Sequence, residues 1–176
     1  CGVNKILLIT ISGEDQAGVT AGITAILSGY AVNILDIGQA VIHATLSLGL
    51  LVELPEACAS EEVAAAVRNF AMHRDLRVVT SEVANQSYTH WVEAQGRARY
   101  IITLLARKIT ADQLARVTHV ISHHGLNIDA IKRLSGRIPL GKLPALSKAC
   151  LEFSARGALR DPAAFRRELL EVAGVL

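Results

Sequence analysis

The chain carries one pattern of residues twice, and this internal repeat constrains its fold more than any other feature. The sequence Asn-Ile-Leu-Asp-Ile at residues 33–37 returns as Asn-Ile-Asp-Ala-Ile at residues 127–131, displaced by 94 positions from Asn33 to Asn127. Without a gap, the same offset aligns residues 6–8 with 100–102 and Ala21 with Ala115. It also aligns Ile23, Ile26, Leu27 and Ser28 with Val117, Val120, Ile121 and Ser122. A repeat of this length predicts two copies of one folding module.

The two copies differ most in one loop. Residues 13–18 read Gly-Glu-Asp-Gln-Ala-Gly in the first copy, whereas the aligned residues 107–112 read Arg-Lys-Ile-Thr-Ala-Asp. The same scaffold is therefore expected to carry two different loop chemistries.

The first copy predicts the element order βαββαβ. Short apolar runs bounded by turn residues predict buried strands, and apolar residues at helical spacing predict helices. His43-Ala44 is the expected turn of a hairpin, and Ser60 is the expected N-cap of the second helix. The expected elements are a strand at 5–11, a helix at 18–28, strands at 33–42 and 45–54, a helix from Ser60, and a strand at 76–83.

The second copy repeats this order but ends early. Thr110 and Gln113 predict a capping box at the start of its first helix, and Asp161 before Pro162 predicts the start of its second. The residues after Val172 are too few for a helix end, a turn and a strand, since a mean strand alone takes roughly 5 to 6 residues. The other expected elements are a strand at 99–105 and strands at 127–134 and 148–155 around a loop at 135–147.

These elements place the chain in the α+β class, as two ferredoxin-like (βαββαβ) modules in tandem. We expect a first domain at 1–84, a polar linker at 85–98 with Trp91 docking on a domain, and a second domain at 99–176 that lacks its last strand. An unfinished sheet leaves an exposed edge that a partner chain can cover. We also expect the chain to be part of a longer protein.

The composition limits the classes of partner. The chain has 176 residues, 51% of them apolar, and its 18 basic and 16 acidic residues give a net charge of +2 without long runs. This charge pattern argues against nucleic acid and membranes as partners and favours small molecules or proteins. Cys1, Cys58 and Cys150 lack metal-ligand spacing, so we expect no disulfide framework, no zinc site and a reducing cytoplasm.

The loop between the first strand and the first helix is the strongest candidate for a ligand site. Unpaired N–H groups at a helix start attract a carboxylate, and Gly18 lets a ligand approach the backbone closely. Asp15 can then hold an ammonium group, so the loop suits an amino acid. The alternative is structural, with Asp15 capping the helix and the glycines serving the turn.

Asn33 and Asn127 open the second strand of each copy, directly after a helix. Their recurrence indicates a shared role, either in a ligand contact or in satisfying the backbone of the turn. The spacing leaves both roles open.

Several motifs resemble a known family. The pattern Gly13-x-Asp15-x-x-Gly18-Val19-Thr20 after a strand, with Asn-Ile opening the next strand, resembles the ACT domain. Periodicity does not demand the residue identities of three further stretches, which resemble the N-terminal regulatory half of bacterial phosphoserine phosphatases: Trp91 to Gly96, Leu126 to Leu140 and Leu151 to Gly157.

The resemblance implies an amino-acid site built from the first loop of one module and the start of the second strand of the other. L-Serine is the implied ligand, and its few atoms imply a modest affinity. The implied contact residues are Asp15, Gln16, Gly18, Val19, Thr20, Asn127 and Ile128. A weaker second pocket comprises Asn33, Ile34, Arg107 and Lys108, because its loop lacks the Gly and Asp of the pattern.

In that family a haloacid-dehalogenase-type phosphatase domain follows the ACT pair and uses Mg²⁺ with an aspartate nucleophile in a D-x-D motif. This chain has no D-x-D motif, so we assign it no catalytic residue, no metal ligand and no cofactor, and Mg²⁺ belongs to the implied catalytic domain. The resemblance implies a homodimer that senses L-serine and regulates serine biosynthesis through that domain.

Two alternatives remain: a stand-alone tandem ACT regulator resembling the glycine-cleavage repressors, and a pair of modules that only mediates dimerisation. A D-x-D-x-[TV] motif in the coding sequence beyond Leu176 would decide for the phosphatase. A ferredoxin-like RNA binder needs exposed aromatic residues for base stacking, and aromatic residues make up only 4% of the chain.

Overall fold

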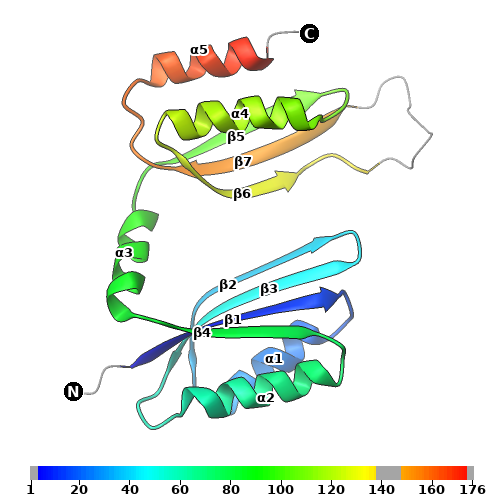
Figure 1. Cartoon of the computed structure of the whole chain (residues 1–176), viewed down its shortest axis with the longest axis vertical. Coiled ribbons are helices and arrows are strands. Elements are labelled where there is room, and N and C mark those ends of the chain that lie inside the picture. Colours follow the sequence, from blue (N-terminus) through cyan, green and yellow to red (C-terminus); the bar gives the residue numbers. More distant parts are fainter. Residues whose placement is uncertain (1–3, 138–147, 174–176) are drawn as a thin grey trace. The chain divides into compact units, whose positions relative to one another are not determined.

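The computed structural model describes residues 4–137 and 148–173 and divides the chain into two compact units, Cys1–His90 and Trp91–Leu176 (Figure 1). Each unit has one antiparallel sheet with two helices on one face. The predicted α+β class and the ferredoxin-like tandem are therefore confirmed. No helix in the described ranges is long and apolar enough to cross a membrane.

The first unit follows the predicted order βαββαβ. Its strands are arranged in the sheet as β2-β3-β1-β4, and every neighbouring pair is antiparallel. Both helices lie on the same face of this sheet (Figure 1). The elements are β1 (Lys5–Glu14), α1 (Val19–Ser28), β2 (Asn33–Ile42), β3 (Thr45–Leu54), α2 (Ser60–Met72) and β4 (Arg77–Val83).

Alternating burial along the central strands builds the core of the first unit. Leu7, Ile9 and Ile11 of β1 are at most 3% exposed, while Leu8 on the opposite face of the sheet is 38% exposed. This alternation is the period of two that a strand with one covered face requires. The helices add Val19, Ile23 and Leu27 from α1, and Val63, Val67 and Ala71 from α2.

The second unit has three described strands, in the order β5-β7-β6. Among the described residues β5 has a neighbouring strand on one side only, whereas its counterpart β1 lies between two strands. This order matches the expected lack of a last strand in the second module, while residues 138–147 of the expected loop lie outside the described ranges. The elements are β5 (Arg99–Ala106), α4 (Ala111–His123), β6 (Asn127–Arg133), β7 (Ala149–Arg156) and α5 (Pro162–Ala173).

The repeat is less regular in space than in sequence. Across the first sheet the residue in the same row as Asn33 is Ile6, and across the second sheet the residue in the same row as Asn127 is Arg99. The offset is therefore 94 positions between the second strands and 93 positions between the first strands.

The gap-free alignment of 6–8 with 100–102 is consequently wrong. A shift of one residue moves every side chain of a strand to the other face of the sheet. Ile101, which the sequence offset aligns with the buried Leu7, is 50% exposed.

One expected N-cap is wrong, and one helix was not expected from the sequence. The N-cap of α2 is Ala59, and Ser60 is the first helical residue, with its hydroxyl donating to Glu82 Oε1 at 2.8 Å. The expected linker contains a helix, α3 (Asn85–Gln95), none of whose residues is buried. A helix without a buried stripe leaves no apolar periodicity in the sequence, so the pattern could not predict it.

The expected helix starts of the second unit are confirmed. Thr110 and Gln113 form both bonds of the capping box at α4. At α5, Asp161 Oδ1 accepts from the Ala164 N–H at 2.9 Å, as an N-cap residue does.

Candidate functional site

Residues 15–18 connect β1 to α1 and end at a glycine in a left-handed conformation. Gly18 is the N-cap of α1, with φ 85°, which residues with a Cβ rarely adopt. A Cβ at Gly18 would meet no described atom within 4 Å beyond the adjacent residues. No side chain of the described residues caps the helix, so its first N–H groups need acceptors from outside the helix.

Asp15 lies in the same loop with an unpaired carboxylate. Its backbone N–H donates to Ala44 O at 2.7 Å, which ties the loop to the β2–β3 turn. Among the described residues no group hydrogen-bonds or ion-pairs with the Asp15 carboxylate. Because Gly18 is the N-cap and no side chain caps it, Asp15 does not have the capping role that was the structural alternative.

The other expected residues of this loop are partly engaged in the fold. Gln16 Nε2 donates to Arg74 O at 3.0 Å. Thr20 Oγ1 donates to Gln39 Oε1 at 2.6 Å, a contact with β2 that the sequence did not reveal. The Val19 side chain is 2% exposed in the core, so only its backbone is available to a ligand.

The loop between β5 and α4 differs from the first loop, because its helix start has a side-chain cap. Arg107 and Lys108 are exposed between β5 and α4. Thr110 Oγ1 accepts from the Gln113 N–H at 3.2 Å, and Gln113 Oε1 accepts from the Thr110 N–H at 3.1 Å. This capping box satisfies donors at the start of α4, whereas α1 has no side-chain cap.

The expected strand residues open β2 and β6. Asn33 and Ile34 are exposed in the first unit, and Ile34 shows 44% of its surface. Asn127 is exposed in the second unit, while Ile128 packs partly against the core. The structure thus places the first loop, Asn33 and Ile34 in one unit, and the remaining expected residues in the other.

Both strands carry a bulge at the same point of the repeat. The ladder skips Leu35 in β2 and Asp129 in β6, which are 94 positions apart. A bulge inserts one residue that has no ladder partner. The first copy fills this position with an apolar residue and the second with a charged one.

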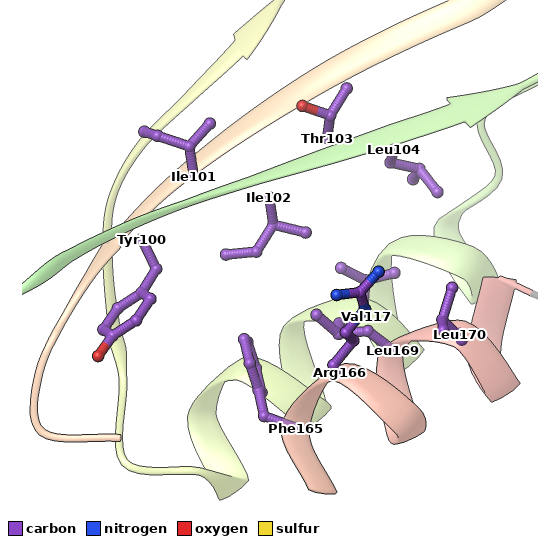
Figure 2. A pocket seen from close by; sticks show the side chains of 10 residues that line it. All are labelled: Tyr100, Ile101, Ile102, Thr103, Leu104, Val117, Phe165, Arg166, Leu169 and Leu170. Carbon is purple, nitrogen blue, oxygen red and sulfur yellow. The ribbon is translucent and has the colours of Figure 1, made fainter. Parts of the chain in front are cut away.

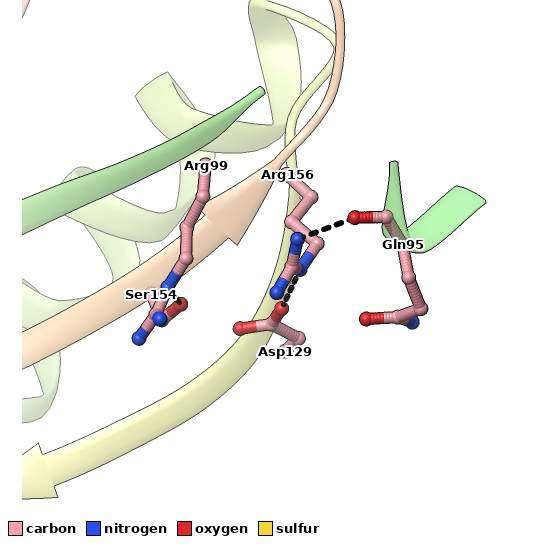
Figure 3. Close-up of polar contacts among 5 residues, drawn as sticks. All are labelled: Gln95, Arg99, Asp129, Ser154 and Arg156. Carbon is pink, nitrogen blue, oxygen red and sulfur yellow. Dashed lines mark hydrogen bonds and ion pairs between the residues drawn. The ribbon is translucent and has the colours of Figure 1, made fainter. Parts of the chain in front are cut away.

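A polar cluster surrounds the bulge of β6, and it was not predicted from the sequence. Arg156 on β7 donates from Nε to Asp129 Oδ2 at 2.8 Å and from a terminal nitrogen to Gln95 O at 2.7 Å (Figure 3). Arg99 Nε donates to Ser154 Oγ at 2.8 Å. The Ser154 hydroxyl hydrogen-bonds in turn to Asp129.

The cluster sets the charge state of Asp129. Burial raises the pKa of this carboxyl, but the hydrogen bonds from Ser154 and Arg156 and the positive charges of Arg156 and Arg99 hold the pKa below its ordinary value. Asp129 therefore stays charged at neutral pH and keeps Arg156 oriented.

A cavity of about 360 Å³ lies beside β5 in the second unit (Figure 2). Ile102 of β5 faces Phe165 and Leu169 of α5 across it, and Arg166 is a charged residue at its wall. Burying an amino acid's two charges in such apolar surroundings is costly. The cavity contains none of the expected ligand residues, so it is not the candidate site.

A family model described as the ACT domain matches residues 5–81. The match runs from β1 to β4 and includes the loop that holds Asp15 and Gly18.

Two curated relatives are phosphoserine phosphatases. The protein from Streptomyces coelicolor is 29% identical over 157 residues, covering 89% of this chain and 35% of the relative. Phosphoserine phosphatase SerB2 from Mycobacterium tuberculosis is 32% identical over 137 residues, covering 73% of this chain and 31% of the relative. The chain thus spans about a third of the length of these two relatives.

Two solved structures share the fold over nearly the whole chain. An unknown protein from Galdieria sulphuraria matches with a TM-score of 0.74 at 14% identity, covering 97% of this chain and 92% of that one. A putative glycine cleavage system transcriptional repressor matches with a TM-score of 0.64 at 13% identity, covering 98% and 92%. The family match places the first unit, which holds residues 5–81, in the ACT domain family, and most of the chain aligns with the two phosphoserine phosphatases.

Proposed function

We propose that this chain is a regulatory region that binds L-serine. The observation that carries the proposal is the pairing, within one loop, of the uncapped start of α1 with the unpaired Asp15 carboxylate. A free amino acid carries one carboxylate and one ammonium group, so it needs one group of donors and one anion. The loop offers both within a few residues.

In this proposal the backbone N–H groups at the start of α1 receive the ligand carboxylate. Asp15 receives the ammonium group, and Gly18 keeps the approach free of a Cβ. The proposed contact residues are Asp15, Gln16, Gly18, Val19, Thr20, Asn127 and Ile128, with a weaker set of Asn33, Ile34, Arg107 and Lys108.

The choice of serine rests on the relatives, because removing the phosphate from phosphoserine yields serine. A site that hydrogen-bonds the serine hydroxyl discriminates against alanine, which would leave those groups unpaired. We propose that the chain acts as a homodimer in the cytoplasm and couples serine occupancy to a phosphatase domain. Such coupling typically amounts to roughly 1 to 3 kcal/mol and is reciprocal.

A stand-alone regulator is the second candidate. The repressor-like structure supports it, since that chain is covered to 92% and so has no large additional domain beside the shared fold. A D-x-D-x-[TV] motif in the coding sequence after Leu176 would favour the phosphatase, and its absence would favour the regulator. A pair of modules that only dimerises would bind no amino acid at all.

Calorimetric titration of Asp15→Ala with L-serine tests the site. We expect the affinity to fall at least about tenfold, since the ligand ammonium loses its charged partner. Asp112→Ala is the matched control, because it removes an aspartate whose ion pair with Arg116 lies exposed on α4. Unchanged affinity in a folded Asp15→Ala protein would remove this loop from the site.

A further inference from the structure

The polar cluster of the second unit joins two segments that are distant in sequence. The Arg156 guanidinium contacts the bulge residue of β6 through Asp129 and the end of α3 through Gln95 O. These contacts bridge 27 and 61 positions of the chain, respectively. One side chain on β7 therefore holds both segments at once (Figure 3).

The contact at Gln95 acts as a helix cap supplied from another element. The last carbonyl groups of a helix have no partner within the helix, and a positive charge near them is favoured by the helix dipole. Arg156 provides both a donor, at 2.7 Å from Gln95 O, and the charge. A second link, from the Gly157 N–H to Ala98 O at 3.2 Å, lies beside it.

The contact at Asp129 lies next to the strand residues expected to bind the ligand. Asp129 directly follows Ile128, and Arg156 is the ladder partner of Asn127. A ligand that moves or orders the start of β6 therefore acts on the same guanidinium that caps α3.

One neighbour of Asp129, Ser154, is buried. Ser154 is 4% exposed, and its hydroxyl accepts a hydrogen bond from Arg99 Nε. The first copy has the apolar Leu35 at the matching bulge, so this arrangement belongs to the second copy alone among the described residues.

We propose that Asp129 is a positioning residue that, through Arg156, couples the start of β6 to the end of α3, so that amino-acid binding at Asn127 and Ile128 tightens α3. The role as a ligand relay rests on the proposed function, whereas the link between β6 and α3 does not. α3 is the segment in which the boundary between the two units falls, so its order matters to any signal that leaves the second unit.

Backbone hydrogen exchange of residues 91–97 in the whole 176-residue chain tests the proposal. Without ligand, we expect Asp129→Asn to raise exchange there roughly fivefold over the unsubstituted chain, because the cap loosens and the last turn frays. Arg156→Gln should act in the same direction, and it keeps the test valid if Asp129→Asn does not fold. Asp112→Asn is the matched control and should leave exchange in this segment unchanged.

Saturating L-serine supplies the second arm of the test, with calorimetry recording binding in each protein. We expect L-serine to slow exchange at 91–97 in the unsubstituted chain but not in Asp129→Asn, although the latter still binds. Unaltered exchange in ligand-free Asp129→Asn would overturn the link itself. Equal slowing by L-serine in both proteins would overturn the relay.

The same experiment distinguishes failure of the serine site from failure of the link between β6 and α3. If the unsubstituted chain gives no heat with L-serine, the serine site and the relay are both contradicted. A ligand-free effect of Asp129→Asn in that case would still support the link between β6 and α3.

Discussion

Single residues decide which polar groups of this chain are left unpaired and which are paired within the fold. Gly18 leaves the start of α1 without a side-chain cap, and Asp15 in the same loop has a carboxylate that pairs with none of the described residues. Asp129 is the opposite case, because Arg156 and Ser154 engage its carboxylate. Gly18 and Asp15 therefore leave groups that a ligand can contact, whereas the carboxylate of Asp129 is engaged within the fold.

The pKa of Asp129 predicts how the stability of the fold depends on pH. Because the folded-state pKa lies below the ordinary value, charged Asp129 stabilises the fold above about pH 4, the unfolded value. That stabilisation is lost as the pH falls from there through the folded-state pKa. Urea unfolding from pH 7 down to pH 3 should therefore show a smaller drop in stability for Asp129→Asn than for the unsubstituted chain.

Asp112→Asn controls for the loss of one negative charge, since its carboxylate pairs with Arg116 on the exposed face of α4. Parallel pH curves for Asp129→Asn and the unsubstituted chain would contradict the assigned charge state of Asp129.

The position of the first loop between β1 and α1 could be predicted from the sequence, because its glycines and Asp15 follow a spacing of only a few positions. The partners of Asp129 could not be predicted in this way. Arg156 lies 27 positions from Asp129 and 61 from Gln95, so the contacts depend on the register of β6 against β7. The only signal in the sequence is the charge of Asp129. Its position at a bulge is known only from the pairing of β6 with β7.

The secondary-structure elements follow local patterns closely, but their register does not follow from the repeat. Apolar patterns predicted α1 and β3, since each buries one face. The capping box predicted the start of α4. Apolar patterns missed α3, which buries no residue. The repeat offset slipped by one position in β5, because aligning apolar runs does not reveal which face of a strand each residue occupies.

The capping box of α4 should contribute measurably to the stability of the fold. Thr110→Ala should lower the free energy of unfolding by about 1 kcal/mol, because the Gln113 N–H loses its acceptor. Thermal unfolding followed by circular dichroism measures the loss. Thr118→Ala is the matched control in the same helix, since its hydroxyl donates to the helix carbonyls of Leu114 and Ala115. Equal losses in the two variants would contradict the role of the cap.

The packing of α1 on α2 gives a second prediction. Gly22→Ala would ordinarily stabilise a helix by about 1 kcal/mol, but a Cβ at Gly22 would overlap the Phe70 ring. The Arg74 guanidinium lies over that ring, with Cζ at 3.7 Å from the ring centroid. We expect a net loss of roughly 1 to 3 kcal/mol from overpacking.

A double-mutant cycle with Phe70→Leu separates the two effects of Gly22→Ala, with urea unfolding as the readout. In the Phe70→Leu background the substitution should cost less, or should stabilise. The same cost in both backgrounds would show that the ring is not the cause.

For the whole molecule, the tandem combines two similar scaffolds with unequal loops. The first unit has four described strands and an uncapped helix start, whereas the second has three described strands and a helix start closed by its capping box. This inequality predicts that the two copies differ in ligand binding, although they share a fold. We therefore expect about one bound amino acid per chain rather than two.

A calorimetric titration of the chain with L-serine, with glycine, D-serine and L-alanine as comparisons, decides whether the chain senses serine. We expect saturable binding that is selective for L-serine, with a stoichiometry near one per chain. An absence of binding at millimolar L-serine, or equal binding of L-alanine, would contradict this expectation.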